Sequence, residues 1–348
     1  MKSIGYAAES AGAELKPFHF NRRDLRPNDV AIEILYSGIC HSDLHTVNGD
    51  WGEQPYPLIP GHEIVGRVTA IGADVKKYQV GENVAVGCMV DSCQNCDQCE
   101  QGDEQFCRNG LTATYGSRDR LSGEVTQGGY SKNIVVREEF VLKVPESLSL
   151  ETAAPILCAG ITTYSPLKAW KVGPGTRVGV IGLGGLGHMA VKLAVAMGAE
   201  VTVISRSKDK QENAKAIGAT GILCSKDQDE MQKAANSFDF ILDTVPVKHD
   251  FNTYMPLLDV DGSLVLVGQI GPMEEIMTVP LVFGRRRIAG SLIGGIAETQ
   301  EVLDFCAQHG IHPECKMINI DQVNQAWGEL TKGNPAHRFV IDMSSLSL

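Results

Sequence analysis

The sequence predicts an α/β protein built from a β-rich part and a doubly wound parallel sheet, and three observations support this prediction. The chain has 348 residues, which is enough for about two domains that each bury a core. Residues 1–150 hold short strand-like segments separated by glycine or proline, whereas strands and helices alternate from about Pro155 onward. We therefore expect one domain at 1–154 and 296–348, and a second domain at 155–295.

The expected strands are short, apolar and bounded by turn residues. In the first domain they are 30–40, 63–72 and 82–87, and a loop with three prolines lies just before the second of them. In the second domain a helix at 185–198 follows the first strand, and the strands are 177–182, 200–207, 238–245, 262–268 and 287–294. The tail is expected to fold back on the first domain with two helices and a strand, at 298–310, 320–333 and 338–343.

Composition and charge narrow the possible partners. Apolar residues make up 43% and charged residues 21% of the chain, as in an ordinary globular protein, and there is no apolar run long enough to span a membrane. The net charge of −11 argues against nucleic acid or an anionic lipid surface as the main partner, so an anionic ligand needs a local basic cluster. The first residues contain no cleavable apolar leader, so the cysteines suggest a cytoplasmic protein that binds metal.

Four cysteines predict a structural zinc site. Cys93, Cys96 and Cys99 follow one another at every third residue, and Cys107 completes the set. A short loop with this spacing can surround one ion with three thiolates, and the fourth closes the tetrahedron of a structural Zn²⁺ site. Disulfides are one alternative, although no oxidising compartment is indicated. An iron–sulfur cluster is the other, although the fourth cysteine is too distant for the compact ferredoxin spacing and no proline follows it.

A glycine-rich turn predicts that the second domain is a dinucleotide-binding Rossmann domain. The motif G-x-G-x-x-G joins the strand at 177–182 to the helix at 185–198. Its first glycine permits the tight turn, its second lets the backbone approach a pyrophosphate, and its third lets helix and strand pack closely. A turn that binds no ligand is the alternative. The expected cofactor contacts are Gly182, Leu183, Gly184, Gly185, Leu186 and Gly187.

The end of the next strand favours NADP over NAD. An acid at this point would hold the ribose hydroxyls of NAD, but Asp209 lies past the strand tip. A guanidinium offers paired charge-assisted hydrogen bonds to a 2′-phosphate, and the missing acid removes a source of repulsion. A solvated basic turn is the alternative. The expected phosphate contacts are Ser205, Arg206, Ser207, Lys208 and Lys210.

Several ordered motifs resemble those of one family. Residues 61–75 are similar to the zinc signature of zinc-dependent medium-chain alcohol dehydrogenases, with Gly61, His62, Glu63, Gly66 and Gly72 in place. The segment 40–45, the four cysteines, Cys158 and the glycine-rich turn extend the resemblance over the whole chain. The segments SRSKDK, DTVPV and GSLIGG resemble the cinnamyl-alcohol-dehydrogenase-like, NADP-dependent branch. The resemblance implies a GroES-like catalytic domain beside the Rossmann domain.

The resemblance further implies a catalytic zinc held by Cys40, His62 and Cys158, with the fourth position open to water or a substrate oxygen. It places Glu63 beside the zinc, where this carboxylate would transiently displace the water. Asp43 would accept a hydrogen bond from His62 and fix its tautomer. Taken singly, the two cysteines and the histidine would be interpreted as packing residues.

A proton relay and contacts to the nicotinamide half of the cofactor are also implied. Ser42 would hydrogen-bond the substrate oxygen, contact the cofactor and pass the proton through the nicotinamide ribose to His45. In isolation these two residues would be a capping hydroxyl and a surface histidine. His41 and Arg338 are further candidates for contact with the pyrophosphate. The other implied cofactor contacts are Thr162, Thr244, Gly268, Ser291, Leu292 and Ile293.

These motifs together predict an aldehyde reductase that also oxidises primary alcohols, in which zinc acts as a Lewis acid and NADPH supplies the hydride. Aryl or cinnamyl aldehydes are candidate substrates. An NAD-dependent polyol dehydrogenase and a zinc-stabilised dinucleotide sensor without turnover are the alternatives. The strand at 287–294 could pair across the two-fold axis of a homodimer. Trp51 is either a pocket residue or a core aromatic, and Cys88 is expected near the four cysteines without a ligand role.

Overall fold

The chain folds into two units, and the computed structural model describes residues 1–268, 271–273, 275–333 and 337–346. The first unit comprises Met1–Ile161 and Gly294–Leu348, and the second comprises Thr162–Ile293. The boundary between the units at Ile161 and Thr162 falls inside a continuous helical segment. In this segment α3 (Leu150–Pro155) continues through a π-helical turn (Ile156–Gly160) into α4 (Ile161–Ala169). The sequence therefore contains no turn residues at this boundary. The alternation of strands and helices that marks the second domain in the sequence begins at Pro155 instead.

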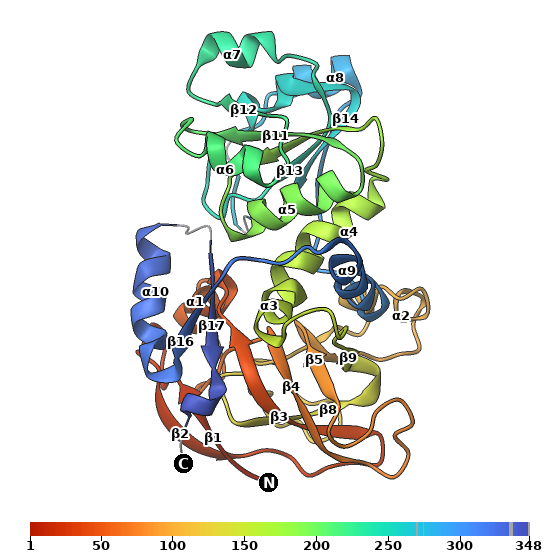
Figure 1. The fold of residues 1–348 in the computed structure, drawn as a ribbon, viewed down its shortest axis with the longest axis vertical. Coiled ribbons are helices and arrows are strands. Elements are labelled where there is room, and N and C mark those ends of the chain that lie inside the picture. The colour runs from red at the N-terminus through yellow and green to blue at the C-terminus, as the bar shows by residue number, and fades with distance from the viewer. Residues whose placement is uncertain (269–270, 274, 334–336, 347–348) are drawn as a thin grey trace. The chain divides into compact units, whose positions relative to one another are not determined.

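A seven-stranded sheet forms the centre of the first unit (Figure 1). Its strand order is β16-β17-β3-β4-β5-β9, and β8 also pairs with β3. The central strand β3 (Asp29–Gly38) is mostly buried and pairs antiparallel with β4 (Ile64–Ile71), β8 (Asn133–Arg137) and β17 (Arg338–Asp342). Because β17 comes from the end of the chain, the expectation that the tail folds back on the first domain is confirmed.

The other elements of the first unit are shorter. A pair of antiparallel strands, β1 and β2, lies near the N-terminus, and a second pair, β6 and β7, flanks the cysteine-rich segment. No helix in the described part of the chain is long and apolar enough to cross a membrane. The bounds are β1 (Lys2–Ala7), β2 (Lys16–Asn21), α1 (His41–Asn48), β5 (Asn83–Val86), β6 (Met89–Asp91), α2 (Asp97–Glu100), β7 (Thr112–Ala113), β9 (Leu142–Lys143), α9 (Ile296–His309), β16 (Cys315–Asn319) and α10 (Val323–Lys332).

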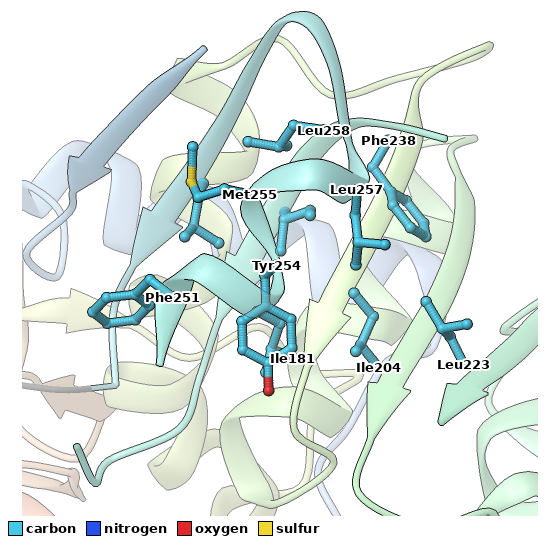
Figure 2. Packing of buried hydrophobic residues seen from close by; sticks show 11 residues of the cluster. Ile181, Ile204, Leu223, Phe238, Phe251, Tyr254, Met255, Leu257 and Leu258 are labelled. Atoms are coloured by element: carbon cyan, nitrogen blue, oxygen red, sulfur yellow. The ribbon is translucent and has the colours of Figure 1, made fainter. Parts of the chain in front are cut away.

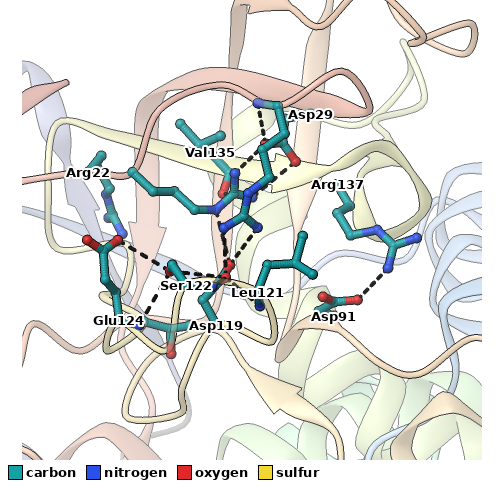
Figure 3. A network of polar contacts seen from close by, with 12 residues as sticks. Arg22, Asp29, Asp91, Asp119, Leu121, Ser122, Glu124, Val135 and Arg137 are labelled. Atoms are coloured by element: carbon teal, nitrogen blue, oxygen red, sulfur yellow. Dashed lines mark hydrogen bonds and ion pairs between the residues drawn. The ribbon is translucent and has the colours of Figure 1, made fainter.

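Arginine–carboxylate pairs tie the loops of the first unit to one another (Figure 3). Arg26 contacts both carboxylate oxygens of Asp119, and the same carboxylate accepts hydrogen bonds from the backbone N–H groups of residues 121 and 122. Arg137, at the end of β8, donates to Asp91 at 2.7 Å. Bidentate pairing gives directional hydrogen bonds as well as charge attraction, so these contacts fix the loop conformation.

The second unit is a six-stranded parallel sheet in the order β12-β11-β10-β13-β14-β15. Parallel sheets with helices on their faces bury their strands, which explains why β10 and β13 read as nearly continuous apolar runs. One apolar cluster packs Ile181 and Ile204 with Phe251 and Tyr254 (Figure 2). The bounds are β10 (Arg177–Ile181), α5 (Gly185–Ala196), β11 (Glu200–Ser205), α6 (Gln211–Ala216), β12 (Gly221–Cys224), α7 (Gln228–Lys233), β13 (Phe238–Asp243), β14 (Leu258–Leu266), α8 (Val279–Gly284) and β15 (Arg287–Gly290).

All of the strands that the sequence predicts are present, and their ends shift by a few residues. The sequence missed β12, because Gly221–Cys224 is short and only half-buried. It also missed helix α1, since this eight-residue helix is polar and carries no clear apolar stripe. In the first unit it further missed seven strands, β1, β2, β6, β7, β8, β9 and β16.

Candidate active site

The four closely spaced cysteines converge on one point of the first unit. The ligand atoms of Cys93, Cys96, Cys99 and Cys107 all lie within 4.8 Å of one another. The sulfurs of Cys93 and Cys99 are 3.9 Å apart. This is too far for a disulfide, and it is close to the ~3.8 Å expected for two sulfurs that each lie ~2.3 Å from a tetrahedral zinc. The donor set therefore fits a closed site with four thiolate ligands.

A second cluster brings together residues that are far apart in the sequence. Cys40, His62, Glu63 and Cys158 are all buried, and their ligand atoms also lie within 4.8 Å of one another. Cys40 is the N-cap of α1, and the histidine and glutamate directly precede β4. Cys158 lies in the π-helical turn Ile156–Gly160. Such turns widen a helix locally and often occur at functional sites.

The sulfur spacing of this second cluster also fits a metal. Cys40 Sγ lies 3.7 Å from Cys158 Sγ, again close to the ~3.8 Å between two zinc-bound sulfurs. The hydrogen bond with Cys158 lowers the pKa of Cys40 well below its usual value, and the same contact raises the pKa of Cys158. This contact therefore favours the thiolate form of Cys40 over that of Cys158. Two sulfurs and one imidazole suit zinc far better than magnesium or calcium.

The Asp43 carboxylate holds the groups around this cluster in place through several hydrogen bonds. Its carboxylate is fully buried, and Oδ1 lies 3.0 Å from His62 Nδ1. The backbone N–H groups of Cys40 and Gly61 and the hydroxyl of Tyr130 donate to the same carboxylate, each at 3.0 Å. Because Nδ1 is engaged by an acceptor, Nε2 of His62 is left as the nitrogen that can bind a metal.

Glu63 reaches the cluster with one free oxygen. Its Oε1 lies 2.5 Å from Arg338 Nη2, whereas its Oε2 is buried without a hydrogen-bond partner among the described residues. Burial raises the pKa of Glu63 to about 7, although Arg338 acts in the opposite direction. A Cβ atom at Gly38 would lie only 1.9 Å from Oε2, so a glycine is required behind this carboxylate. An unpartnered buried oxygen beside two thiols and an imidazole fits a group that contacts a metal intermittently.

The relay residues Ser42 and His45 lie one turn apart on α1. Ser42 Oγ is 3.5 Å from Cys40 Sγ, so the hydroxyl borders the metal cluster. His45 is partly exposed, and its Nδ1 lies 2.8 Å from Asp50 Oδ2. Trp51 stacks on the histidine ring with a centroid separation of 5.3 Å. Trp51 is 40% exposed, which excludes the core-aromatic interpretation.

Three residues near the cluster were not identified from the sequence. Asp50 could have been found as a carboxylate just beyond the end of α1, but this signal is weak. Cys88 was expected near the four cysteines, and it instead lies beside the second cluster, where it hydrogen-bonds Cys158 and the Leu157 carbonyl. Tyr115 is buried with its ring centroid 6.0 Å from that of His62. No sequence pattern marks the last two residues.

The glycine-rich turn of the second unit has the shape of a phosphate cradle. Gly182 has φ +90°, a conformation that a side chain rarely tolerates, and Gly184 is the N-cap of α5. A Cβ atom at Gly187 would lie 2.2 Å from the Gly182 carbonyl oxygen, and one at Gly268 would lie 2.4 Å from the Thr244 carbonyl carbon. These backbones approach so closely that only glycine fits. The turn therefore fits the pyrophosphate of a dinucleotide at a helix N-terminus.

Some side chains of the basic turn after β11 bind neighbouring acidic groups, and others remain in a position to bind a phosphate. Lys208 pairs with Glu230, and the Ser207 hydroxyl donates to Asp209 at 2.9 Å. Lys210 donates from Nζ to the Leu183 carbonyl at 3.0 Å, which places its charge against the glycine-rich turn. Arg206 is exposed at the strand tip. Arg206 and Lys210 therefore have the best position to meet a phosphate on the adenosine ribose.

The other predicted cofactor contacts lie just after strands β13 and β15 and in helix α4. The Thr244 hydroxyl follows β13 and donates to the Ile181 carbonyl at 2.8 Å, directly below the glycine-rich turn. Thr162 is buried in α4, and Ser291, Leu292 and Ile293 follow β15. Arg338, an expected pyrophosphate contact, is instead 6% exposed and paired with Glu63.

Family models match most of the chain. Residues 26–146 match the alcohol dehydrogenase GroES-like domain, and residues 185–308 match the zinc-binding dehydrogenase model. The chain is 52% identical over 344 residues to NADP-dependent alcohol dehydrogenase C of Mycobacterium bovis, covering 98% of both proteins. It is also 50% identical to the aldehyde reductase YahK of Escherichia coli over the full length of both chains.

Solved structures agree with these matches. A cinnamyl alcohol dehydrogenase from Sorghum bicolor superposes with a TM-score of 0.96 at 42% identity, covering 100% of this chain and 99% of that one. A cinnamyl alcohol dehydrogenase from Helicobacter pylori, solved with NADP(H), gives a TM-score of 0.91 at 43% identity with the same coverage. The chain therefore belongs to the zinc-dependent medium-chain alcohol dehydrogenase family, in its cinnamyl-alcohol-dehydrogenase-like branch.

Proposed function

We propose that this protein is an NADP-dependent zinc alcohol dehydrogenase that reduces aldehydes with NADPH and oxidises primary alcohols in the reverse direction. The observation that carries the proposal is the second metal cluster. The ligand atoms of two thiols and an imidazole lie close together, and Glu63, which a salt bridge holds at its other oxygen, is the fourth member of this group among the described residues. A site with three firm ligands leaves one position for a substrate oxygen. The closed four-cysteine site then has a structural role.

The residues around the cluster account for binding and orientation. When bound, zinc polarises a carbonyl oxygen as a Lewis acid and NADPH supplies the hydride. Asp43 holds the His62 ring so that Nε2 faces the other ligands. Arg338 offsets the negative charge of Glu63 in a buried setting. Cys88 and Tyr115 border the same space and would limit which substrates fit there.

Proton delivery is assigned to α1. The Ser42 hydroxyl borders the cluster and would hydrogen-bond the substrate oxygen. His45 lies one turn further along the helix, at the solvent side, and would supply the proton through the nicotinamide ribose. Asp50 accepts from the Nδ1–H group of His45, and this hydrogen bond leaves Nε2 as the nitrogen that exchanges the proton.

Cofactor choice follows from the end of β11. Arg206 and Lys210 provide two cations near the site of the adenosine ribose, and the acid at this turn, Asp209, is engaged by Ser207. The relatives that are named as NADP-dependent or solved with NADP(H) support the same choice for this chain. Aryl and cinnamyl aldehydes are the proposed substrates, because two of the solved structures that superpose on this chain are cinnamyl alcohol dehydrogenases.

A homodimer is part of the proposal. The strand β15 is the last strand of the parallel sheet, so one of its edges has no partner in the described residues. The adjoining α8 exposes Val282 and Phe283, at 74% and 87%. An unpaired edge beside exposed apolar side chains is a surface that a second copy of the chain can cover. The open edge favours a second chain over a small ligand, since only a strand can pair with it.

A substrate panel with metal analysis tests the proposed function. Short aliphatic, aryl and cinnamyl aldehydes are assayed with NADPH and NADH, and zinc is counted per chain. We expect two zinc ions, preference for NADPH, and turnover of at least the aryl aldehydes. Cys158→Ala should lose one zinc and all turnover while it still binds NADPH. The control is Cys306→Ala, which changes a buried cysteine of α9, and it should keep both zinc ions and its turnover. Turnover by Cys158→Ala, or polyol oxidation with NAD, would overturn the proposal.

A further inference from the structure

The carboxylate of Asp43 links two of the segments that carry the second metal cluster. Oδ1 accepts from the backbone N–H of Gly61 and lies beside His62 Nδ1, each at 3.0 Å, and Oδ2 accepts from the backbone N–H of Cys40 at 3.0 Å. Each of these contacts comes from a metal-ligand candidate or from the residue next to one. A carboxylate that orients a metal-bound histidine is itself held by further hydrogen bonds, and such partners affect metal affinity.

Tyr130 donates a further hydrogen bond to this carboxylate from a different part of the chain. Its hydroxyl lies 3.0 Å from Asp43 Oδ2, and its side chain is 0% exposed. Burial and the charge of Asp43 raise the pKa of the Tyr130 phenol, so the hydroxyl keeps its proton and is the donor. A hydrogen bond to an ionised acceptor is stronger than one between neutral groups. Tyr115 also interacts with Asp43, and in addition with Thr46 of α1.

The segment that ends at Tyr130 runs beside the loop that precedes β4. The backbone N–H of Tyr130 donates to the Pro60 carbonyl at 3.0 Å, and that of Gly129 donates to the Gly61 carbonyl at 2.8 Å. Gly61 has φ +106°, and a Cβ atom there would lie 2.6 Å from Cδ1 of the Tyr130 ring. Glycine at this position therefore lets the tyrosine ring lie against the loop, with its hydroxyl at the buried carboxylate.

Arg22 holds the backbone on both sides of Tyr130 (Figure 3 labels the Arg22 side chain). This arginine is buried, and its hydrogen-bond partners among the described residues are all uncharged. They are the backbone carbonyls of Gln127, Gly128 and Asn133 and the hydroxyl of Ser131. Burial and the nearby Arg23 lower the pKa of Arg22 to about 9, so the group stays charged at neutral pH. A buried charge without a counter-ion depends on all of its acceptors, so Arg22 fixes this segment in one conformation.

Tyr130 has no direct contact with the atoms that would react. Its hydroxyl is buried and donates to Asp43, and Asp43 contacts Nδ1 of His62, the ring nitrogen opposite the one available for a metal. The tyrosine can therefore influence the chemistry only through the aspartate and the histidine. All of these residues, and Arg22, lie in the first unit.

We propose that Tyr130 is a positioning residue for the catalytic zinc site, which holds Asp43 so that the His62 ring keeps the direction a metal requires. The inference rests on the proposed function, which assigns catalysis to the second cluster. Without the phenol hydroxyl, Oδ2 loses a donor inside a buried site, so the carboxylate can turn and the histidine ring can turn with it. The four-cysteine site is built from other residues, so only one of the two zinc sites should weaken.

Zinc affinity measured separately at the two sites tests this assignment. The holoenzyme is equilibrated in zinc buffers of decreasing free zinc concentration, and the zinc retained per chain is counted. Tyr130→Phe removes one hydroxyl and keeps the ring. It should weaken the catalytic zinc about tenfold and change the affinity of the four-cysteine site less than about twofold. The Cys158→Ala chain, which is expected to lose the zinc of the second cluster, identifies which release step belongs to which site.

Tyr78→Phe is the matched control. Tyr78 is a buried tyrosine of the first unit, and its hydroxyl donates to the Val141 carbonyl. The same substitution there also removes one buried hydrogen bond, so we expect the melting temperature to fall by a similar amount in both variants. Zinc affinity should stay unchanged at both sites of Tyr78→Phe. The comparison therefore separates lost stability from lost positioning.

A double-mutant cycle with Asp43→Asn shows through which group Tyr130 acts. Asp43→Asn alone should weaken the catalytic zinc, and Tyr130→Phe added to it should weaken this zinc less than about twofold further, because the connection is already broken. Full additivity, an unchanged zinc affinity in Tyr130→Phe, or equal weakening of both zinc sites would overturn the proposal. A native chain that holds zinc only at the four cysteines would instead defeat the proposed function.

Discussion

At the residue scale, the site depends on charged side chains that each fix the orientation of one neighbouring side chain. Asp43 fixes the ring of His62, Arg338 engages one oxygen of Glu63, and Asp50 engages one nitrogen of His45. Only the first of these pairings could be expected before the structure, because the resemblance to the family implies it. The other two join residues whose proximity is created by the fold. The roles of the individual site residues stay predictions that the following variants test.

Replacement of Asp50 tests the relay. Asp50→Asn removes the carboxylate that fixes the His45 tautomer, because an amide can turn either its oxygen or its nitrogen toward Nδ1. We expect kcat for aldehyde reduction to fall about tenfold to a hundredfold, while zinc content and the Kd of NADPH stay the same. Steady-state kinetics with metal analysis checks this. Asp50→Glu should recover part of the rate, and an unchanged kcat in the Asn variant would remove Asp50 from the relay.

Replacement of Arg206 tests cofactor selection. Arg206→Ala removes the exposed guanidinium at the tip of β11, so it should weaken NADPH much more than NADH, by about tenfold or more in KM. The comparison between the two cofactors is its own control, because a general disturbance of the second unit would affect both. An equal effect on NADPH and NADH would contradict the assignment of the 2′-phosphate site.

At the element scale, most strands of the second unit follow from the sequence, whereas in the first unit only β3, β4, β5 and β17 do. Buried parallel strands such as β10 and β13 are continuous apolar runs, and glycine or proline marks their ends. The polar α1 and the short β12 have no such signal, since their stability comes from packing against the rest of the fold. No sequence pattern predicts the π-helical turn that carries Cys158, although this turn supplies a metal-ligand candidate.

The junction between β10 and α5 gives a prediction for an element. Gly187→Ala would place a methyl group 2.2 Å from the Gly182 carbonyl oxygen, so α5 must move away from the strand. We expect NADPH binding to be lost and the melting temperature to fall, with a cost of about 1–3 kcal/mol for the forced shift. Gly221→Ala, where no atom lies within 4 Å of the added Cβ, is the matched control. Normal NADPH affinity in Gly187→Ala would show that the turn tolerates a side chain.

At the scale of the whole molecule, the assembly can be tested through α8. Phe283 is 87% exposed next to the open edge of the parallel sheet. Phe283→Lys places a charge in the proposed interface, and charge burial without a partner is unfavourable. We expect the native chain to elute with twice its 37.5 kDa mass in light scattering, and the variant to shift toward the monomer. Leu121→Lys, at an exposed position of the first unit, should remain dimeric. A monomeric native chain would contradict the proposed dimer.

The salt bridge between Glu63 and Arg338 also has a consequence for biosynthesis. Arg338 begins β17, the last strand of the chain, and it lies beside a glutamate that is made far earlier. While the ribosome still holds the C-terminal segment in its exit tunnel, every thiol and imidazole of the second cluster has already emerged, but their neighbouring carboxylate has no counter-charge. The charge balance around these thiols and this imidazole is therefore complete only after the finished polypeptide has left the ribosome.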